Sequence, residues 1–137
     1  MKRTSSILFA ICFLLFDNCF SQPSITWQRI YDGPDSLWDA AYDVCLSTNG
    51  NFFVVGYTTT FSTNKDIYVL KLDPYGDTLW TRLIGTTGGQ EGYAVASAND
   101  GGCVLTGFWD SAFTIKLSIN GNIVWQRFYG GRFIPVL

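Results

Sequence analysis

The sequence of 137 residues contains no histidine and a single glutamate, Glu91. Histidine is the commonest general base and the commonest metal ligand among side chains, so a histidine-dependent catalytic or zinc centre is excluded. The serine, threonine and cysteine side chains lack the histidine partner that would activate them as nucleophiles. The sequence therefore assigns no catalytic residue, no metal ligand and no cofactor-binding residue.

Positive charge is also scarce. Lysine and arginine together number 9 against 11 acidic residues, which gives a formal net charge of −2, and they form no basic run. Nucleic-acid binding depends on clustered lysine and arginine, so nucleic acid is not expected as a partner. With 47% hydrophobic and 15% charged residues, the composition is that of a globular chain of one domain.

No apolar run reaches the roughly 20 residues that a membrane-spanning helix needs. A run of ten apolar residues occupies positions 7–16, after two basic residues, and the small residues Cys19 and Ser21 stand at −3 and −1 of a cleavage site after Ser21. We expect residues 1–21 to be a signal peptide of a bacterial secreted or cell-surface protein, with no membrane span after its removal. An uncleaved anchor is the alternative.

Cysteine is limited to Cys45 and Cys103 once the signal peptide is removed. Two thiols in an exported protein can form a disulfide. The two positions are not equivalent in the repeats described next, so we favour two buried small side chains, and the sequence leaves their redox state open.

An internal repeat is the main positive feature of the sequence. The segments WQRIYDG (27–33), WTRLIGT (80–86) and WQRFYGG (125–131) align, and the longer segments 42–57 and 71–80 align with 93–108 and 116–125 at spacings of 45 to 53 residues. The structural repeat positions are Trp27, Trp80 and Trp125, Gly50 and Gly101, Gly56 and Gly107, and Gly76 and Gly121.

Each full copy predicts four short β-strands, rich in β-branched and aromatic residues and bounded by Gly, Asn and Asp. The predicted strands are 40–47, 51–58, 67–72 and 78–84, then 92–98, 103–109, 113–119 and 123–129, with an orphan fourth strand at 25–31. Asn-Gly and Asp-Gly-Gly separate the first two strands of each copy, as hairpin turns require. No segment after residue 22 has the 3.6-residue period of a helix.

Four antiparallel strands in each repeat match the length and order of a β-propeller blade, of the kind found in WD-type repeats. We therefore predict an all-β chain in which residues 22–137 form a partial propeller, with blades at 40–84 and 92–129 and an apolar tail at 130–137. Closed propellers have about four to eight blades, and two blades expose apolar faces to water. We expect a truncated member of a larger propeller, with a ring of two-blade chains as the alternative.

The patterns W-x-x-x-Y-G-G, D-G-G-x-x-x-x-G and K-L-D-x-x-G-x-x-x-W resemble those of secreted bacterial β-propeller-like repeat proteins over nearly all of residues 25–131. Many such proteins carry a C-terminal sorting domain for type IX secretion, and none is visible here. Ser118 departs from the pattern, because the first copy has Asp73 at that position. The block that ends at Trp80 is also similar to the tryptophan-docking motif of quinoprotein propellers, in which the tryptophan packs between blades.

The hairpin LDPYGDTLW (72–80) is predicted to be architectural. Asp73 can accept backbone hydrogen bonds across the turn, Pro74 fixes φ, and Gly76 takes a conformation that other residues avoid. Since the second copy keeps the glycine and the tryptophan without the aspartate and the proline, the repeat preserves what a hairpin needs rather than a binding site.

For function, the expectation is an exported, non-catalytic binding or scaffold module that contacts a surface protein or a glycan. The alternative is a fragment of a propeller enzyme, quinoprotein-like or a hydrolase, whose site lies in other blades. Trp38 and Trp109 are candidate ligand-contact aromatics, because they lie in or beside loops and have no counterpart in the other copy. The alternative is that both are partly buried packing residues, as Trp27, Trp80 and Trp125 are expected to be core residues.

The carboxylates give no comparable candidate. Four aspartates are close in sequence at positions 32, 35, 39 and 43, but turn chemistry explains them without a cation. Glu91 and Asp100 stand at opposite ends of one predicted strand, about 30 Å apart at roughly 3.3 Å per residue, so they are not expected to act as an acid/base pair.

Overall fold

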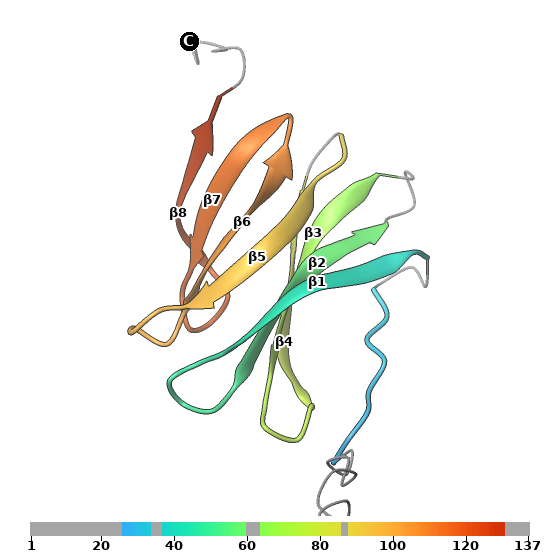
Figure 1. Cartoon of the computed structure of the whole chain (residues 1–137), viewed down its shortest axis with the longest axis vertical. Helices are drawn as coiled ribbons and strands as arrows, with labels where there is room; N and C mark the ends of the chain where they lie inside the picture. The colour runs from blue at the N-terminus through green and yellow to red at the C-terminus, as the bar shows by residue number, and fades with distance from the viewer. Residues whose placement is uncertain (1–25, 34–36, 60–63, 86–87, 131–137) are drawn as a thin grey trace, which may run out of the picture.

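The computed structural model describes residues 26–33, 37–59, 64–85 and 88–130 (Figure 1). Within these ranges the chain is all-β and forms two four-stranded antiparallel sheets. The first sheet contains β1 (Asp39–Leu46), β2 (Phe52–Thr59), β3 (Lys65–Leu72) and β4 (Thr78–Ile84). The second sheet contains β5 (Glu91–Ser97), β6 (Cys103–Trp109), β7 (Ser111–Leu117) and β8 (Ile123–Tyr129).

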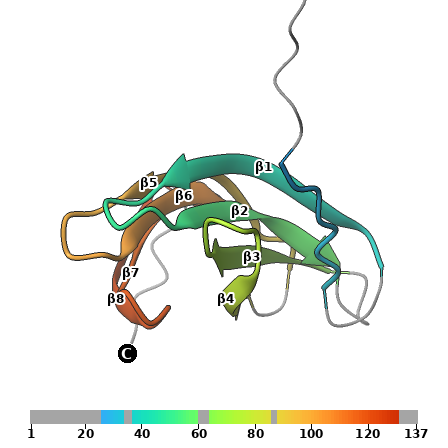
Figure 2. The ribbon, with the colours of Figure 1, turned by 90° about the horizontal axis from the view of Figure 1, so that it is seen from below.

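The strands of each sheet lie in sequence order, so each neighbour pair is a simple hairpin. Figures 1 and 2 show the two sheets side by side, with β1 and β5 adjacent along one edge and β4 and β8 at the opposite edge. The second sheet packs against the first mainly through β5, which contacts β1 and β2. No helix in the described ranges is long and apolar enough to cross a membrane.

The eight strands predicted in the two copies are all present, and their ends differ from the prediction by at most two residues. The orphan strand predicted at 25–31 is wrong: residues 26–31 are described and form no strand. A β-strand needs a hydrogen-bonded neighbour, whereas this segment binds the first sheet through side chains that contact the turn between β3 and β4. The predicted signal peptide at 1–21, Asp35 and residues 131–137 of the apolar tail lie outside the described residues.

The hairpin turns follow the predicted chemistry. Gly50 and Gly101 have φ values of 83° and 79°, and Gly76 and Gly121 have 80° and 79°, all in the region that favours glycine. In the β3–β4 turn, Oδ1 of Asp73 accepts hydrogen bonds from the backbone N–H groups of residues 75 and 77 at 2.8 and 2.9 Å. The hydroxyl of Ser118 accepts the equivalent bond in the β7–β8 turn, which explains why the aspartate is dispensable there.

A hydrophobic core fills the space between the two sheets. It consists of buried side chains from one face of each sheet: Phe53, Val55, Ile67, Val69 and Ile84 from the first, and Val95, Cys103, Leu105, Phe113, Ile115 and Leu117 from the second. Each buried side chain of this size contributes roughly 1.5–3 kcal/mol by leaving water. The two sheets therefore form a single packed unit rather than two independent domains.

Both cysteines lie at this core. Cys103 belongs to it, Cys45 packs against it, and both are free thiols. Burial raises the pKa of both thiols, that of Cys103 to about 12. The favoured sequence interpretation, two small packing side chains, agrees with this placement.

The repeated tryptophans join neighbouring elements. Nε1 of Trp80, on β4, donates a hydrogen bond to the carbonyl of Ile119 in the β7–β8 turn of the second sheet, at 3.0 Å. The ring lies over Gly121, where a Cβ atom would contact it at 3.2 Å. Only a residue without a side chain allows this approach, so the glycine and the tryptophan of the repeat serve one contact between sheets.

Trp27 makes the same contact although it lies on no strand. Its Nε1 donates a hydrogen bond to the carbonyl of Pro74 at 3.1 Å, and its ring covers Gly76. The prediction that the three tryptophans are core residues is therefore wrong for Trp27 and Trp125, whereas Trp80 packs against the core between the sheets. Trp80 is half-buried, whereas Trp27 and Trp125 keep 37% and 38% of their surface exposed, because they bind turns at the periphery or face solvent.

Candidate functional site

The first strand of each sheet contains a β-bulge at a tyrosine. Pairing of β1 with β2 shifts between Ala41 and Asp43, and pairing of β5 with β6 shifts between Gly92 and Ala94, which leaves Tyr42 and Tyr93 as the extra residues. A bulge turns a side chain out of the alternation of its strand. Both tyrosines are therefore directed away from the packed faces, and they are 47% and 49% exposed.

The repeated glycines of β2 and β6 allow these bulges. A Cβ atom on Gly56 would overlap the carbonyl of Ala40, and one on Gly107 would overlap the carbonyl of Glu91. The first strand of each sheet thus approaches its neighbour closely beside the bulged tyrosine. A tyrosine and a glycine that are distant in sequence together create one local geometry in both copies.

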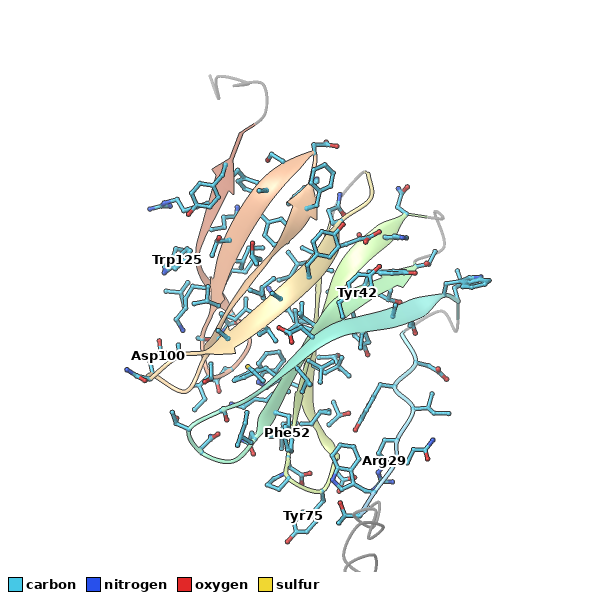
Figure 3. All side chains as sticks on the ribbon, in the orientation of Figure 1. Arg29, Tyr42, Phe52, Tyr75, Asp100 and Trp125 are labelled. Carbon is cyan, nitrogen blue, oxygen red and sulfur yellow. The ribbon has the colours of Figure 1, made fainter. Side chains whose placement is uncertain are left out.

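The bulged tyrosines meet at the edge where β1 and β5 lie side by side. The ring centroids of Tyr42 and Tyr93 are 5.5 Å apart, and Tyr57 on β2 lies 5.7 Å from Tyr42 on its other side. These separations and their tilted planes are typical of favourable aromatic pairs. We call these three residues the tyrosine cluster; Figure 3 labels Tyr42 in its place on β1, near the junction of the sheets.

An ion pair supports the tyrosine cluster from within. Nζ of Lys65, at the start of β3, binds Oε1 of Glu91, at the start of β5, and lies 4.1 Å from the centroid of the Tyr57 ring. The other carboxylate oxygen of Glu91 accepts a hydrogen bond from the hydroxyl of Tyr42 at 3.1 Å. Tyr93 also hydrogen-bonds this carboxylate. One glutamate thus fixes side chains from both sheets.

The electrostatics of the cluster oppose proton transfer near neutral pH. Burial disfavours the charged form of Glu91, but hydrogen bonds from Lys65 and Tyr42 outweigh it and lower the pKa of the carboxyl. The hydrogen bond to Glu91 raises the pKa of Lys65. Burial, together with the same carboxylate, raises the pKa of Tyr42 and Tyr93. A general acid or base needs a pKa close to the working pH, and every shift here leads away from it.

The two tryptophans proposed from sequence as contact residues have different surroundings. Trp38, just before β1, is 80% exposed, while its backbone carbonyl accepts hydrogen bonds from Thr59. Trp109 packs against the core between the sheets, and its ring lies 5.5 Å from that of Phe128 in an edge-to-face arrangement. Trp38 is therefore available for contact, and Trp109 has the geometry of a packing residue.

The aspartates near the first strand act as hydrogen-bond acceptors for the backbone. Asp39 accepts from the N–H of Gly33, and Asp43 accepts across the sheet junction from the N–H of Val95 at 2.8 Å. Within the described ranges, no three His, Cys, Asp or Glu residues come close enough together to hold a metal ion. Asp100 pairs with Lys116, at the end of β5 remote from Glu91.

Sequence reasoning did not select any member of the tyrosine cluster or its ion pair. The pairing of Tyr42 with Tyr93 was visible as a repeat, yet it served only to align the copies. The available signal was a repeated tyrosine on the first strand of each copy followed by a repeated glycine on the second strand, since each such pair marks a bulge. Lys65 and Glu91 carry no such signal, because each occurs in one copy alone.

No protein-family model matches this chain, and no curated protein matches it either. The site therefore has to be interpreted from its own chemistry. That chemistry consists of three partly exposed aromatic rings with hydroxyl groups, held by an ionised carboxylate and an ammonium group. Such a surface offers flat apolar contact together with polar edges.

Proposed function

We propose that this chain is an exported, non-catalytic binding or scaffold module made of propeller-type blades, and that the tyrosine cluster is its contact surface. The partner is a surface protein or a glycan. Export rests on the sequence of residues 1–21. The blade assignment is supported by the internal repeat, by the order of the four strands in each sheet and by the contact of Trp80 with the neighbouring sheet.

The observation that carries the proposal is the assembly of three tyrosines from two sheets at one exposed edge. Tyrosine provides a large, rigid, amphipathic surface whose ordering costs little side-chain entropy, which is why it dominates many binding surfaces. Here the rings are ordered before any partner binds, since Glu91 binds Tyr42 and Tyr93 and the ammonium group of Lys65 lies over Tyr57. Preordered groups bind with a smaller entropic cost.

The same contacts support a non-catalytic role. The carboxylate of Glu91 already accepts hydrogen bonds from a lysine and two phenols, so it has little capacity left to accept a proton from a substrate. The lowered pKa of Glu91 and the raised pKa of Lys65 hold both in their charged forms at neutral pH. Trp38, 80% exposed and just before β1, is a further aromatic side chain available for contact.

Binding of the fluorescently labelled protein to intact bacterial cells tests the proposal. Cells are treated beforehand with a protease, with periodate or with buffer, so that a protein partner and a glycan partner give different losses of signal. The variant Tyr42→Ala/Tyr93→Ala removes two rings of the cluster. Tyr75→Ala is the matched control, because Tyr75 is 74% exposed and lies on the β3–β4 turn.

We expect the double variant to lose at least about tenfold in binding, as is typical for central aromatic residues, and the control to bind like wild type. Equal binding by all three proteins would refute the assignment of the surface. Turnover of a glycosidic, ester or redox substrate that Glu91→Gln abolishes would replace the proposal with a catalytic role for this site.

A further inference from the structure

Three side chains of the segment 26–33 bind the first sheet. Besides the bond from Trp27 to Pro74, the guanidinium of Arg29 pairs with Asp77 at 3.2 Å, and the hydroxyl of Tyr31 donates to the carbonyl of Gly76 at 2.7 Å. Figure 3 shows Arg29 close to the turn that carries Tyr75. We call residues 73–77 the docking hairpin.

The outermost strand of the second sheet carries the same three side chains. In the aligned segments 27–33 and 125–131, five of the seven residues are identical, including the Trp, Arg and Tyr that bind the docking hairpin. Trp125, Arg127 and Tyr129 alternate along β8, so they project from one face of that strand. All seven residues of β8 are exposed.

The matching strand of the first sheet has a different set. Its equivalents are Trp80, Arg82 and Ile84; Trp80 binds the β7–β8 turn, in which Asn122 replaces Asp77, and Ile84 is buried in the core. Segment 27–33 and β8 thus share a tyrosine that β4 lacks, and only the docking hairpin supplies an aspartate, Asp77, as the partner of the arginine. The set on β8 is complementary to the docking hairpin of the first sheet, not to the turn of the second.

We infer that β8 of one molecule binds the docking hairpin of a second copy, and that residues 26–33 compete with it from within the same chain. Trp125, Arg127 and Tyr129 take the positions of Trp27, Arg29 and Tyr31. The N-terminal segment is thus an internal plug that holds the protein in its unassociated form. The inference goes beyond the proposed function, since the surface lies at the β4–β8 edge, opposite the tyrosine cluster (Figure 2).

The segment covers the first sheet incompletely, which leaves room for the competitor. A cavity of about 170 Å³ remains beside it, lined by Tyr31, Val54, Tyr68 and Leu70 among others. The equivalent face of the second sheet, with Leu105, Phe113 and Ile115, is buried against the first sheet. The first sheet therefore has an unfilled apolar face next to the docking hairpin, and a neighbouring sheet would cover it.

Release of the plug is the first test. Trp27→Ala removes the indole that anchors the segment, and association of wild type, Trp27→Ala and Trp27→Ala/Trp125→Ala is measured by analytical ultracentrifugation over a concentration series. We expect the association constant of Trp27→Ala to exceed that of wild type by roughly tenfold or more, and the double variant to remain unassociated. A folded Trp27→Ala protein that associates no more than wild type, or a double variant that associates equally well, overturns the inference.

A charge exchange tests the same contact with substitutions at exposed positions, which leave the fold intact. Asp77→Arg and Arg127→Asp each place like charges opposite each other, so neither protein alone is expected to associate. An equimolar mixture restores opposite charges at the contact and is expected to give a heavier species. A mixture with the mass of its separate components overturns the inference.

Discussion

The two sheets share their strand order, hairpins and bulges, yet one face differs between them. In the first sheet this face meets the second sheet and carries Phe53, Val55 and Val69, all fully buried. The equivalent positions of the second sheet are Val104, Thr106 and Thr114, which face open space. Within the described residues no sheet packs on this face of the second sheet, and its side chains are smaller and more polar than those of the first.

The repeated lysines differ in the same way. Lys71 extends from the first sheet to the carbonyl of Ile119 in the second, at 3.2 Å, whereas Lys116 binds Asp100 at 2.8 Å within its own sheet. The first sheet has Asn49 where the second has Asp100, so it has no carboxylate there to retain its lysine. The lysine of the first sheet thus binds across the junction between the sheets, and the lysine of the second sheet binds an acceptor within its own sheet.

The largest expected effect concerns the aromatic residue at the junction. Phe53→Ala should lower the free energy of unfolding by about 3–5 kcal/mol, because it leaves a cavity between the sheets. The equivalent Val104→Ala, on the open face, should cost less than about 1 kcal/mol. Urea denaturation of both variants measures the difference. Equal losses would mean that the two faces are equally packed.

The next largest effect is expected at Asp43, whose carboxylate accepts a hydrogen bond across the junction between the sheets. Asp43→Ala removes the acceptor of the Val95 N–H and leaves that buried group unpaired, which should cost about 1–3 kcal/mol. The reciprocal change, Ala94→Asp, introduces the carboxylate where no neighbouring sheet lies and should alter stability by less than about 0.5 kcal/mol. Thermal unfolding of the two variants distinguishes them, and a cost for Ala94→Asp similar to that for Asp43→Ala would contradict the difference between the faces.

A smaller effect is expected from the indole contact. Trp80→Phe keeps an aromatic ring over Gly121 but loses the hydrogen bond to Ile119, so it should cost about 1 kcal/mol. Trp125→Phe is the matched change on the second sheet, and in the unassociated protein it should be close to neutral. Denaturation at low protein concentration gives both values. A loss for Trp125→Phe as large as that for Trp80→Phe would show that Trp125 has a partner within the chain.

The smallest effect is the pH dependence of the ion pair that joins the sheets. Because the pKa of Glu91 is lowered in the folded protein, its stabilising contribution is complete above the unfolded value of about 4.3 and is lost as the pH falls through the lower folded value. Unfolding midpoints between pH 7 and pH 3 should therefore fall less steeply in Glu91→Gln than in wild type. Identical slopes for wild type and Glu91→Gln would exclude a contribution from Glu91.

The strands and turns could be predicted from sequence because their causes are local. Alternating apolar residues, Asn-Gly turns and the carboxylate of Asp73 act within a few residues of one another, and the structure has them where expected. The orphan strand was wrong because a strand depends on its neighbours, and nothing in the sequence of 25–31 tells whether a neighbour is present. The exposure of Trp27 and Trp125 was misjudged for the same reason.

The candidate site was hidden because its geometry arises between the repeats. The alternation of residue types along a strand does not reveal a bulge, and only the packing of β1 on β5 brings Tyr42 next to Tyr93. Glu91 belongs to the site because it pairs with Lys65, which is 26 residues earlier in sequence and on the other sheet. Both candidate tryptophans were selected because they lie in or beside loops, and the sequence could not show that Phe128 packs against Trp109.

The tryptophan contact has a direction: the indole comes from one segment of the chain and the glycine turn from the sheet that follows it in sequence. A contact of this kind joins two different surfaces, so a two-fold pair satisfies both molecules only by forming the contact twice, once in each direction. Copies joined in this way either close into a circle or extend as a helix, according to the angle between adjacent sheets. A single defined mass of the associated form would indicate a closing angle, and a ladder of masses an open one.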